Sequence, residues 1–275
     1  MKVEPLHLDK TLSCGQVFRW RKEGELWCGY INNRPVSLRQ RGCDLEWEGQ
    51  VEEREVGRFL RCDDDLDYIY QDIMVSCGDE RVAALLRDHR GLRILRQDPW
   101  ECSASYVLAT YVHIPRIEQM IDKVCRTFGT DLGGGRFTFP SAEQVLERPE
   151  EARGCGLGFR CERFVGLARA VHRGDLDLEA LKRMPYHDCV RELKRFPGIG
   201  DKVADCIALF ALDHLEAFPV DVRIGQAMQR MYSVTGSYKK VSEAGRLLFG
   251  PYAGVAQEYI YLAAQRRSQR GTTVD

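Results

Sequence analysis

In the first fifty residues, apolar and polar side chains alternate in short runs separated by turn-forming residues. The runs are GQVFRWRK (15–22), LWCGYI (26–31), PVSLR (35–39) and CDLEWE (43–48). Alternation with a period of two is typical of strands that bury one face, and turns this short join antiparallel neighbours. We therefore expect an antiparallel meander at the start of the chain.

From about Glu53 the apolar positions recur with helical spacing. The stretch from Trp100 to Arg267 predicts one helix after another, and its interruptions are GTDLGGGR (129–136), RPEE (148–151) and FPGIG (196–200). GTDLGGGR is most simply a flexible connection between helices, although a glycine run could also approach a phosphate backbone. The pattern predicts a β-rich lobe on a mainly helical body.

The chain has 275 residues, of which 44% are hydrophobic and 29% charged, so it can bury a core in one large or two ordinary domains. Together with the change of period, this favours an α+β fold with a β-rich unit at 1–98 and a helical unit at 99–275. The formal net charge is -1. A polyanion must therefore be bound by a local basic patch rather than by the field of the whole protein.

The eleven cysteines follow no framework spacing, which indicates reduced thiols. The first residues, MKVEPLHLDK, lack the apolar core of a signal peptide, and no run of about 18 apolar residues occurs. We expect an intracellular monomer that does not engage a membrane, in the cytoplasm or nucleoid of a prokaryote or the nucleus of a eukaryote.

The stretch FPGIGDKVADC (196–206) places a glycine turn between two helical patterns. PGIG cannot continue the helix before it, and Gly198 and Gly200 permit a tight turn. The amides at the start of the second helix would then form an anion site that suits a DNA phosphate, and the turn carbonyls could hold a monovalent cation. Such turns also occur as plain helix connectors, so both interpretations remain open.

Lys202 lies one step inside the second helix, where the positive helix terminus disfavours its charged form. Partial desolvation would further favour the free amine, which can attack a carbon atom. Asp221, in the later segment FPVDVRIG, is most simply the N-cap of the next helix. If the amine attacks C1′ of a deoxyribose, the same carboxylate would stabilise the cationic sugar.

FPGIGDKVADC followed by PVDV resembles the helix-hairpin-helix motif of the base-excision DNA glycosylases. Within that superfamily the chain resembles the 8-oxoguanine DNA glycosylases in six segments, which are SCGQVFRW, DPWEC, the PRI region, LGFRCERFV, the hairpin and PYAGVAQEYIY. The resemblance implies a TBP-like β lobe packed on a helical HhH-GPD body, with duplex DNA in the cleft and the damaged nucleotide flipped out. It implies a bifunctional glycosylase and AP lyase for 8-oxoguanine, with Lys202 as Schiff-base nucleophile and Asp221 as catalytic carboxylate.

The resemblance also implies a base pocket. The backbone carbonyl of Gly15 would accept the N7 hydrogen that 8-oxoguanine has and guanine lacks. Cys206 and Phe210 on the lysine helix, with Gln257 and Tyr261 on the C-terminal helix, would form the walls. By their residue types alone, Gly15 is an ordinary turn residue and the other four are ordinary core residues.

For the opposite strand, the resemblance implies that Arg116 and Arg160 contact the orphaned cytosine, whereas from the sequence alone both could be solvated helix-end charges. Phe159 stands where the family usually has a tyrosine wedge. Tyr111, Val112 and His113 replace the family's asparagine run, whose first member fills the gap in the duplex. This departure leaves the preference for cytosine opposite the lesion open. Gly198, Gly200 and Lys202 of the hairpin would contact the DNA backbone.

No cysteine follows Cys206, which excludes the iron–sulfur cluster of endonuclease III relatives, and the six histidines show no zinc-ligand spacing. We expect no required cofactor. Two alternatives remain: a glycosylase for another damaged purine, against which Lys202 argues, and a non-catalytic DNA-binding protein that uses the hairpin only for phosphate contact.

Overall fold

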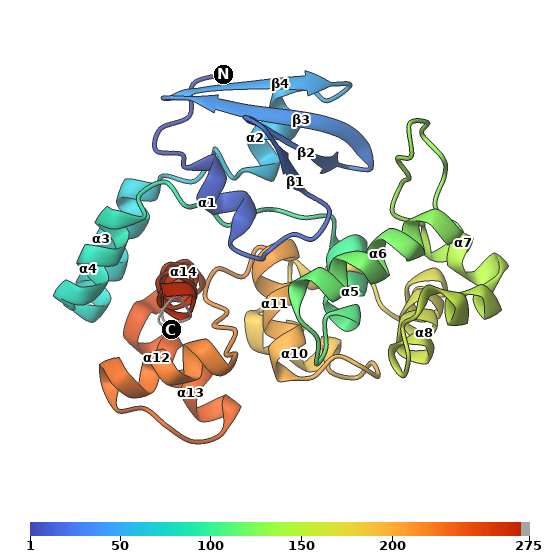
Figure 1. The fold of residues 1–275 in the computed structure, drawn as a ribbon. Coiled ribbons are helices and arrows are strands. Elements are labelled where there is room, and N and C mark those ends of the chain that lie inside the picture. The colour runs from blue at the N-terminus through green and yellow to red at the C-terminus, as the bar shows by residue number, and fades with distance from the viewer. Residues whose placement is uncertain (271–275) are drawn as a thin grey trace.

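The computed structural model describes residues 1–270, with side chains described as far as Gln265. A four-stranded antiparallel sheet forms one side of the molecule and helices form the rest (Figure 1). The strands pair in chain order and are β1 (Arg21–Glu23), β2 (Leu26–Ile31), β3 (Arg34–Arg41) and β4 (Asp44–Gly49). In this register Leu38 lies between Trp27 and Trp47. The predicted meander is confirmed.

The predicted first strand, GQVFRWRK, is wrong over most of its length, because ladder pairing begins only at Arg21. The residues before it form helix α1 (Leu8–Ser13), which the alternation did not indicate, and a loop. Gln16 of that loop is 1% exposed. Its side-chain amide donates to the carbonyl of Arg93 at 2.8 Å and accepts from the amide of Leu95 at 2.9 Å. These bonds fix the segment as a loop packed against later parts of the chain.

The helical pattern after about residue 53 is confirmed. The α-helices are α2 (Glu53–Phe59), α3 (Leu66–Cys77), α4 (Glu80–Asp88), α5 (Pro99–Leu108), α6 (Ile114–Phe128), α7 (Ala142–Glu147), α8 (Arg160–His172), α9 (Leu178–Leu181), α10 (Tyr186–Leu193), α11 (Asp201–Ala211), α12 (Val222–Tyr232), α13 (Tyr238–Phe249) and α14 (Ala253–Arg270). Short 3₁₀ helices cover Pro149–Cys155 and Gly250–Tyr252. GTDLGGGR connects α6 to α7 and is closed by a bridge between Asp131 and Phe137, as expected for a connection between helices.

The sheet buries alternate side chains against the loop that precedes β1 and against α2. Trp27 and Ile31 of β2 are buried, and the intervening Gly29 leaves room for Trp20, because a Cβ at position 29 would lie 2.2 Å from that indole ring. The Trp20 ring stacks on Phe59 of α2 with 5.4 Å between centroids. The sheet lobe thus has an apolar core of its own.

A second, larger apolar cluster fills the helical body and includes side chains from α3 and α4. These two helices fall within the unit predicted at 1–98 yet pack on the body, and α14 packs against α4, α12 and α13. The division of the chain at residue 98 stays a prediction.

Helix α11 lies at the centre of the body, between α5 and α10 (Figure 1). Every residue from Val203 to Ala211 is buried. Helix α14 begins close by, because Gly254 allows the approach: a Cβ there would lie 2.4 Å from Leu209 of α11 and 2.7 Å from the carbonyl of Ala217. This packing brings the start of α11, the segment before α12 and the first turns of α14 together.

Candidate active site

The predicted helix, hairpin and helix are present as α10, the turn and α11. Gly198 adopts φ +97, a conformation that favours glycine, and a Cβ there would lie 2.9 Å from Arg163. Gly200 caps α11 in an extended conformation without a side chain, and the amide of Ala204 is the first to bond back, to Gly200 at 2.9 Å. The amides of the first turn of α11 therefore have no partner within the helix and form a potential anion site.

One pocket collects all seven residues that were predicted for catalysis and base recognition. Its lining residues are Cys14, Gly15, Tyr106, Lys202, Cys206, Phe210, Pro219, Asp221, Gln257, Glu258 and Tyr261. They come from the loop after α1, from α5 and α11, from the segment before α12, and from α14. The pocket is therefore assembled from several elements, and the start of α14 approaches α11 at Gly254 and Leu209.

Asp221 has the predicted structural position. It is the N-cap of α12, and its Oδ1 accepts the amide hydrogen of Ile224 at 2.8 Å. This bond uses one carboxylate oxygen and fixes the side chain at the edge of the pocket. Capping and a role in chemistry are thus compatible in the same residue.

Lys202 lines the pocket from the first turn of α11, and its side chain is exposed. The expected partial desolvation of this lysine is therefore wrong for the free protein, because the first turn of α11 projects to the surface while the rest of the helix is buried. Cys206, one turn further, is 3% exposed. Burial raises the pKa of the Cys206 thiol to about 12, although the charge of Lys202 acts in the opposite direction. Cys206 is accordingly a neutral thiol at physiological pH.

Each of the two aromatic walls of the pocket has a neighbour that holds its ring in place. Phe210 stacks on Tyr106 of α5 with 5.7 Å between centroids and 15° between planes. The hydroxyl of Tyr261 accepts a hydrogen bond from Arg223 at 3.0 Å. Gln257 lines the same pocket, is 3% exposed, and its Oε1 has no hydrogen-bond partner within the described residues. An unpaired amide oxygen can accept a hydrogen bond from the edge of a planar ligand, and aromatic rings in the same pocket can stack on its faces.

Gly15 lines the pocket from the loop after α1. Its φ of +98 requires glycine, and a Cβ there would meet Ile114 at 3.3 Å and the Tyr261 hydroxyl at 3.9 Å. The next residue, Gln16, is tied to the body by the bonds described above, and its carbonyl accepts from Gln97 at 2.6 Å. The position of the Gly15 backbone is thus fixed before any ligand binds.

Sequence reasoning missed four lining residues, which are Cys14, Tyr106, Pro219 and Glu258. Glu258 stands out because it is charged by type and only 5% exposed. An acid inside the otherwise apolar stretch around EYIYLAA is a visible signal, since acidic residues are rarely buried without a reason. Burial, the largest cause, raises the pKa of Glu258 to about 8, and the nearby Asp221 carboxylate raises it as well.

The four residues predicted for the opposite strand form a second group outside this pocket, and its two aromatic side chains are exposed. Tyr111 follows α5 and is 91% exposed, Phe159 precedes α8 and is 54% exposed, and their rings lie 6.4 Å apart. Tyr111 also adopts φ +57, which is uncommon outside glycine. The two rings therefore project together as an exposed aromatic pair.

The two arginines of this group differ in their environment. Arg116 is partly exposed and donates to the carbonyl of Gly156 at 2.9 Å. Arg160 is buried, and its Nε donates to the carbonyl of Thr110 at 2.8 Å. The Arg160 guanidinium also lies over the Phe159 ring, 4.3 Å from its centroid. The interpretation of Arg160 as a solvated helix-end charge is wrong, because its guanidinium holds the backbone beneath the aromatic pair.

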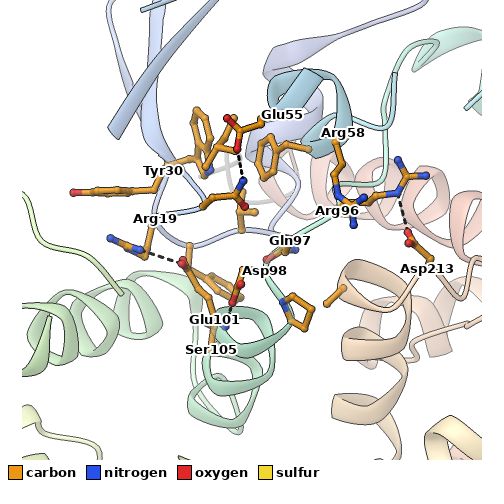
Figure 2. Close-up of a pocket in the computed structure, with 18 of the residues that line it drawn as sticks. Arg19, Tyr30, Glu55, Arg58, Arg96, Gln97, Asp98, Glu101, Ser105 and Asp213 are labelled. Atoms are coloured by element: carbon orange, nitrogen blue, oxygen red, sulfur yellow. Dashed lines mark hydrogen bonds and ion pairs between the residues drawn. The ribbon is translucent and has the colours of Figure 1, made fainter. Parts of the chain in front are cut away.

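Another pocket, which Lys202 does not line, lies between the sheet lobe and the body (Figure 2). Four of its charged residues form ion pairs: Arg19 with Glu101 at 3.1 Å, and Arg96 with Asp213 at 2.9 Å. Arg19 also donates to the carbonyl of Phe137 at 2.6 Å. This pocket is a polar junction that ties the lobe to α5 and to the end of α11.

No group of three or more His, Cys, Asp or Glu residues within the described part of the chain is arranged to hold a metal ion. Among the same residues, no helix is both long and apolar enough to cross a membrane.

A sheet lobe on a helical body, with a Gly/Pro hairpin that presents a lysine beside a capping aspartate, defines a helix-hairpin-helix DNA glycosylase. A family model described as 8-oxoguanine DNA glycosylase, N-terminal domain, matches residues 1–102. The chain is 34% identical to the N-glycosylase/DNA lyase OGG1 of Arabidopsis thaliana over 94% of this chain and 77% of that protein. It belongs to this family of 8-oxoguanine DNA N-glycosylase/DNA lyases.

Two further similarities agree. A probable N-glycosylase/DNA lyase of Methanothermobacter thermautotrophicus is 30% identical over 74% of this chain and 72% of that protein. The crystal structure of Clostridium acetobutylicum 8-oxoguanine glycosylase/lyase, bound to double-stranded DNA with cytosine opposite 8-oxoG, superposes with a TM-score of 0.88 at 29% identity, covering 96% of this chain and 93% of that one. The predicted fold class is thereby confirmed.

Proposed function

We propose that this chain is a bifunctional DNA glycosylase and AP lyase that excises 8-oxoguanine from duplex DNA in base excision repair. The observation that carries the assignment is the convergence of Lys202, Asp221, Gly15 and Gln257 in one pocket. A nucleophile, an anion, a carbonyl acceptor and an amide are the groups that removal of an oxidised purine needs.

In the first step, the Lys202 amine attacks C1′ of the flipped nucleotide. The Nζ–C1′ bond forms, the C1′–N9 bond breaks, and its electron pair leaves with the base. The Asp221 carboxylate stabilises the positive charge that develops on the sugar. Because Asp221 is held by the capping bond to Ile224, its charge is in place before the reaction begins.

In the second step, the sugar ring opens and the Lys202 nitrogen becomes a Schiff base with C1′. This imine acidifies the hydrogen on C2′. Loss of that proton expels the 3′ phosphate by β-elimination. The lysine thus links base removal to strand cleavage, which a water nucleophile could not do.

The other residues take these roles in the proposal. Gly15 distinguishes 8-oxoguanine by accepting its N7 hydrogen, Gln257 bonds the base edge, and Cys206, Phe210 and Tyr261 enclose the ring. Tyr111 and Phe159 fill the gap left in the duplex, and Arg116 faces the opposite base. The amides around Gly198, Gly200 and Lys202 bind a phosphate, and the turn carbonyls can hold a monovalent cation. We further propose an intracellular monomer with a lobe boundary near residue 98.

Borohydride trapping on 8-oxoguanine duplex tests the chemistry. The intact protein should form a covalent adduct with DNA, Lys202→Gln should form none, and the exposed Lys240→Gln should trap like the intact protein. The absence of an adduct from the intact protein would contradict the lyase assignment.

Asp221→Asn isolates the charge of the carboxylate, since asparagine caps a helix about as well as aspartate. Base release should be lost while DNA affinity and stability are largely kept. If the variant excises normally, the hairpin would serve binding alone.

A further inference from the structure

Glu258 lies one residue after Gln257 on α14 and lines the same pocket as Lys202 and Asp221. At about 100° per residue, Gln257, Tyr261 and Glu258 occupy one arc of roughly 100° on the helix, with Tyr261 in the middle. The mechanism above uses the first two of these residues. It gives no task to the third.

The Glu258 carboxyl is buried without a full set of partners. Its side chain is 5% exposed, and Oε2 has no hydrogen-bond partner within the described residues. An unsatisfied buried polar atom costs about 1–3 kcal/mol, so such atoms are rare unless a ligand or function uses them. The Oε1 atom of the adjacent residue, Gln257, is also buried and without a hydrogen-bond partner within the described residues.

The surroundings favour the protonated form of this carboxyl. Burial raises the pKa of Glu258 to about 8, a hydrogen bond with Cys14 and the charge of Lys202 lower it, and the charge of Asp221 raises it. The other titratable groups around it are the thiols of Cys14 and Cys206 and the phenols of Tyr106 and Tyr261, and burial raises the pKa of each of them. These thiols and phenols stay neutral over the range in which Glu258 ionises.

A protonated carboxyl adds a fixed hydrogen-bond donor to the base side of the pocket, beside the amide of Gln257. The Gly15 carbonyl and the Asp221 carboxylate can only accept hydrogen bonds, whereas 8-oxoguanine carries carbonyl oxygens at C6 and C8 that need donors. Moreover, when the C1′–N9 bond breaks, its electron pair remains on the base, whose oxygen and nitrogen atoms become stronger acceptors. A donor fixed at this place would be worth more in the transition state than in the ground state.

We propose that Glu258 is a further recognition residue of the base pocket, which donates a hydrogen bond from its carboxyl hydrogen to an acceptor atom of the flipped 8-oxoguanine and of the departing base. Ionisation of Glu258 removes the donor and adds a second negative charge beside Asp221. Excision therefore declines as the carboxyl loses its proton. This inference rests on the proposed excision of 8-oxoguanine.

The test measures single-turnover excision of 8-oxoguanine from pH 6.5 to 9.5 for the intact protein, Glu258→Gln, Glu258→Ala and the exposed control Glu243→Gln. Glutamine keeps a donor of similar shape but cannot ionise. We expect Glu258→Gln to match the intact protein within about threefold at pH 7 and to lose the decline that the intact protein and Glu243→Gln show above about pH 8. We expect Glu258→Ala to be about 10- to 100-fold slower at pH 7, the equivalent of one lost donor.

A thermal melt of each variant separates this role from a structural one. If Glu258→Ala does not fold, the isosteric Glu258→Gln still decides, because a purely structural carboxyl would leave the pH profile unchanged. Superimposable profiles of Glu258→Gln and the intact protein, or a flat profile of the intact protein between pH 7 and 9.5, would overturn the inference. Failure of the intact protein to release 8-oxoguanine at any pH would instead overturn the proposed function.

Discussion

The hydroxyl of Tyr238 donates to Oδ2 of Asp205 at 2.5 Å, and the oxygen of the Tyr238 hydroxyl accepts the amide hydrogen of Val220 at 3.3 Å. Asp205 lies in α11, one turn after Lys202, and Val220 is the residue before Asp221. Tyr186 and Ser242 also donate to the Asp205 carboxylate, at 2.5 and 3.2 Å. Tyr238 thus connects the helix of the lysine with the segment of the aspartate.

Replacing Tyr238 with phenylalanine removes both bonds and leaves the ring. We expect the single-turnover excision rate to fall by at least tenfold, because a misplacement of about 1 Å between reacting groups can cost about 100-fold. The free energy of unfolding should fall by about 1–3 kcal/mol, since the Val220 amide and Asp205 each lose a partner. Tyr68→Phe, at a position 56% exposed, is the control and should change neither quantity. A normal excision rate in Tyr238→Phe would show that the connection does not position the site.

Two glycine-to-alanine substitutions test the contact between α14 and α11. In Gly254→Ala the new methyl would lie 2.4 Å from Leu209 and 2.7 Å from the carbonyl of Ala217, so the start of α14 must shift. We expect a loss of about 1–3 kcal/mol in the free energy of unfolding, measured by denaturant titration, and slower excision as Gln257 and Tyr261 move with the helix. Gly166→Ala in α8 meets nothing within 4 Å and should stabilise by up to about 1 kcal/mol. Equal effects at the two positions would contradict this account of the pocket.

The sequence predicted the fold well wherever one periodicity extended over a whole element. The meander from Leu26 to Gly49 and the helices on both sides of the hairpin are where the pattern indicated. The error at GQVFRWRK has a physical cause. Its alternating apolar residues are buried by contacts with distant segments, and the bonds that Gln16 makes to Arg93 and Leu95 are not visible in a local pattern.

The candidate site was predictable where the chemistry depends on local geometry. The cap by Asp221 and the glycine turn before Lys202 follow from residue types and spacing alone. Glu258 was not found, because its burial and its proximity to Asp221 depend on how α14 packs against α11. The exposure of Lys202 was likewise not predictable, since the position of a helix start relative to the surface is a tertiary property.

Asp213, beside the pocket of Figure 2, makes stability depend on acid pH. Its carboxylate pairs with Arg61 and Arg96, and their charges hold the pKa of Asp213 below its usual value although burial opposes them. A lowered pKa in the folded state stabilises above the unfolded pKa of about 3.9, and this contribution is lost as the pH falls further. Asp213→Asn should therefore lower the free energy of unfolding by about 1–3 kcal/mol at pH 7, because the buried Arg61 loses a partner.

The same variant should differ less from the intact protein as the pH falls, when the carboxylate of the intact protein is also neutralised. Denaturant titrations at pH 7 and pH 3.5 measure both differences. A difference that grows toward low pH would contradict the assigned sign.

The aromatic pair of Tyr111 and Phe159 predicts weak discrimination of the base opposite the lesion. Tyr111 stands where the resemblance implies an asparagine, whose amide could bond a base edge. Arg160 and Arg116 already donate to backbone carbonyls, those of Thr110 and Gly156. A good bidentate contact to a base is worth about 1–3 kcal/mol, so its loss should reduce selectivity. We expect the excision rates opposite cytosine, thymine, adenine and guanine to differ from one another by less than about tenfold. Single-turnover assays on four matched duplexes measure these rates. Tyr111→Ala should slow excision opposite all four bases alike, because the exposed ring fills space rather than reads sequence. A hundredfold preference for cytosine in the intact protein would contradict this prediction and would require Arg160 to leave Thr110 when DNA binds.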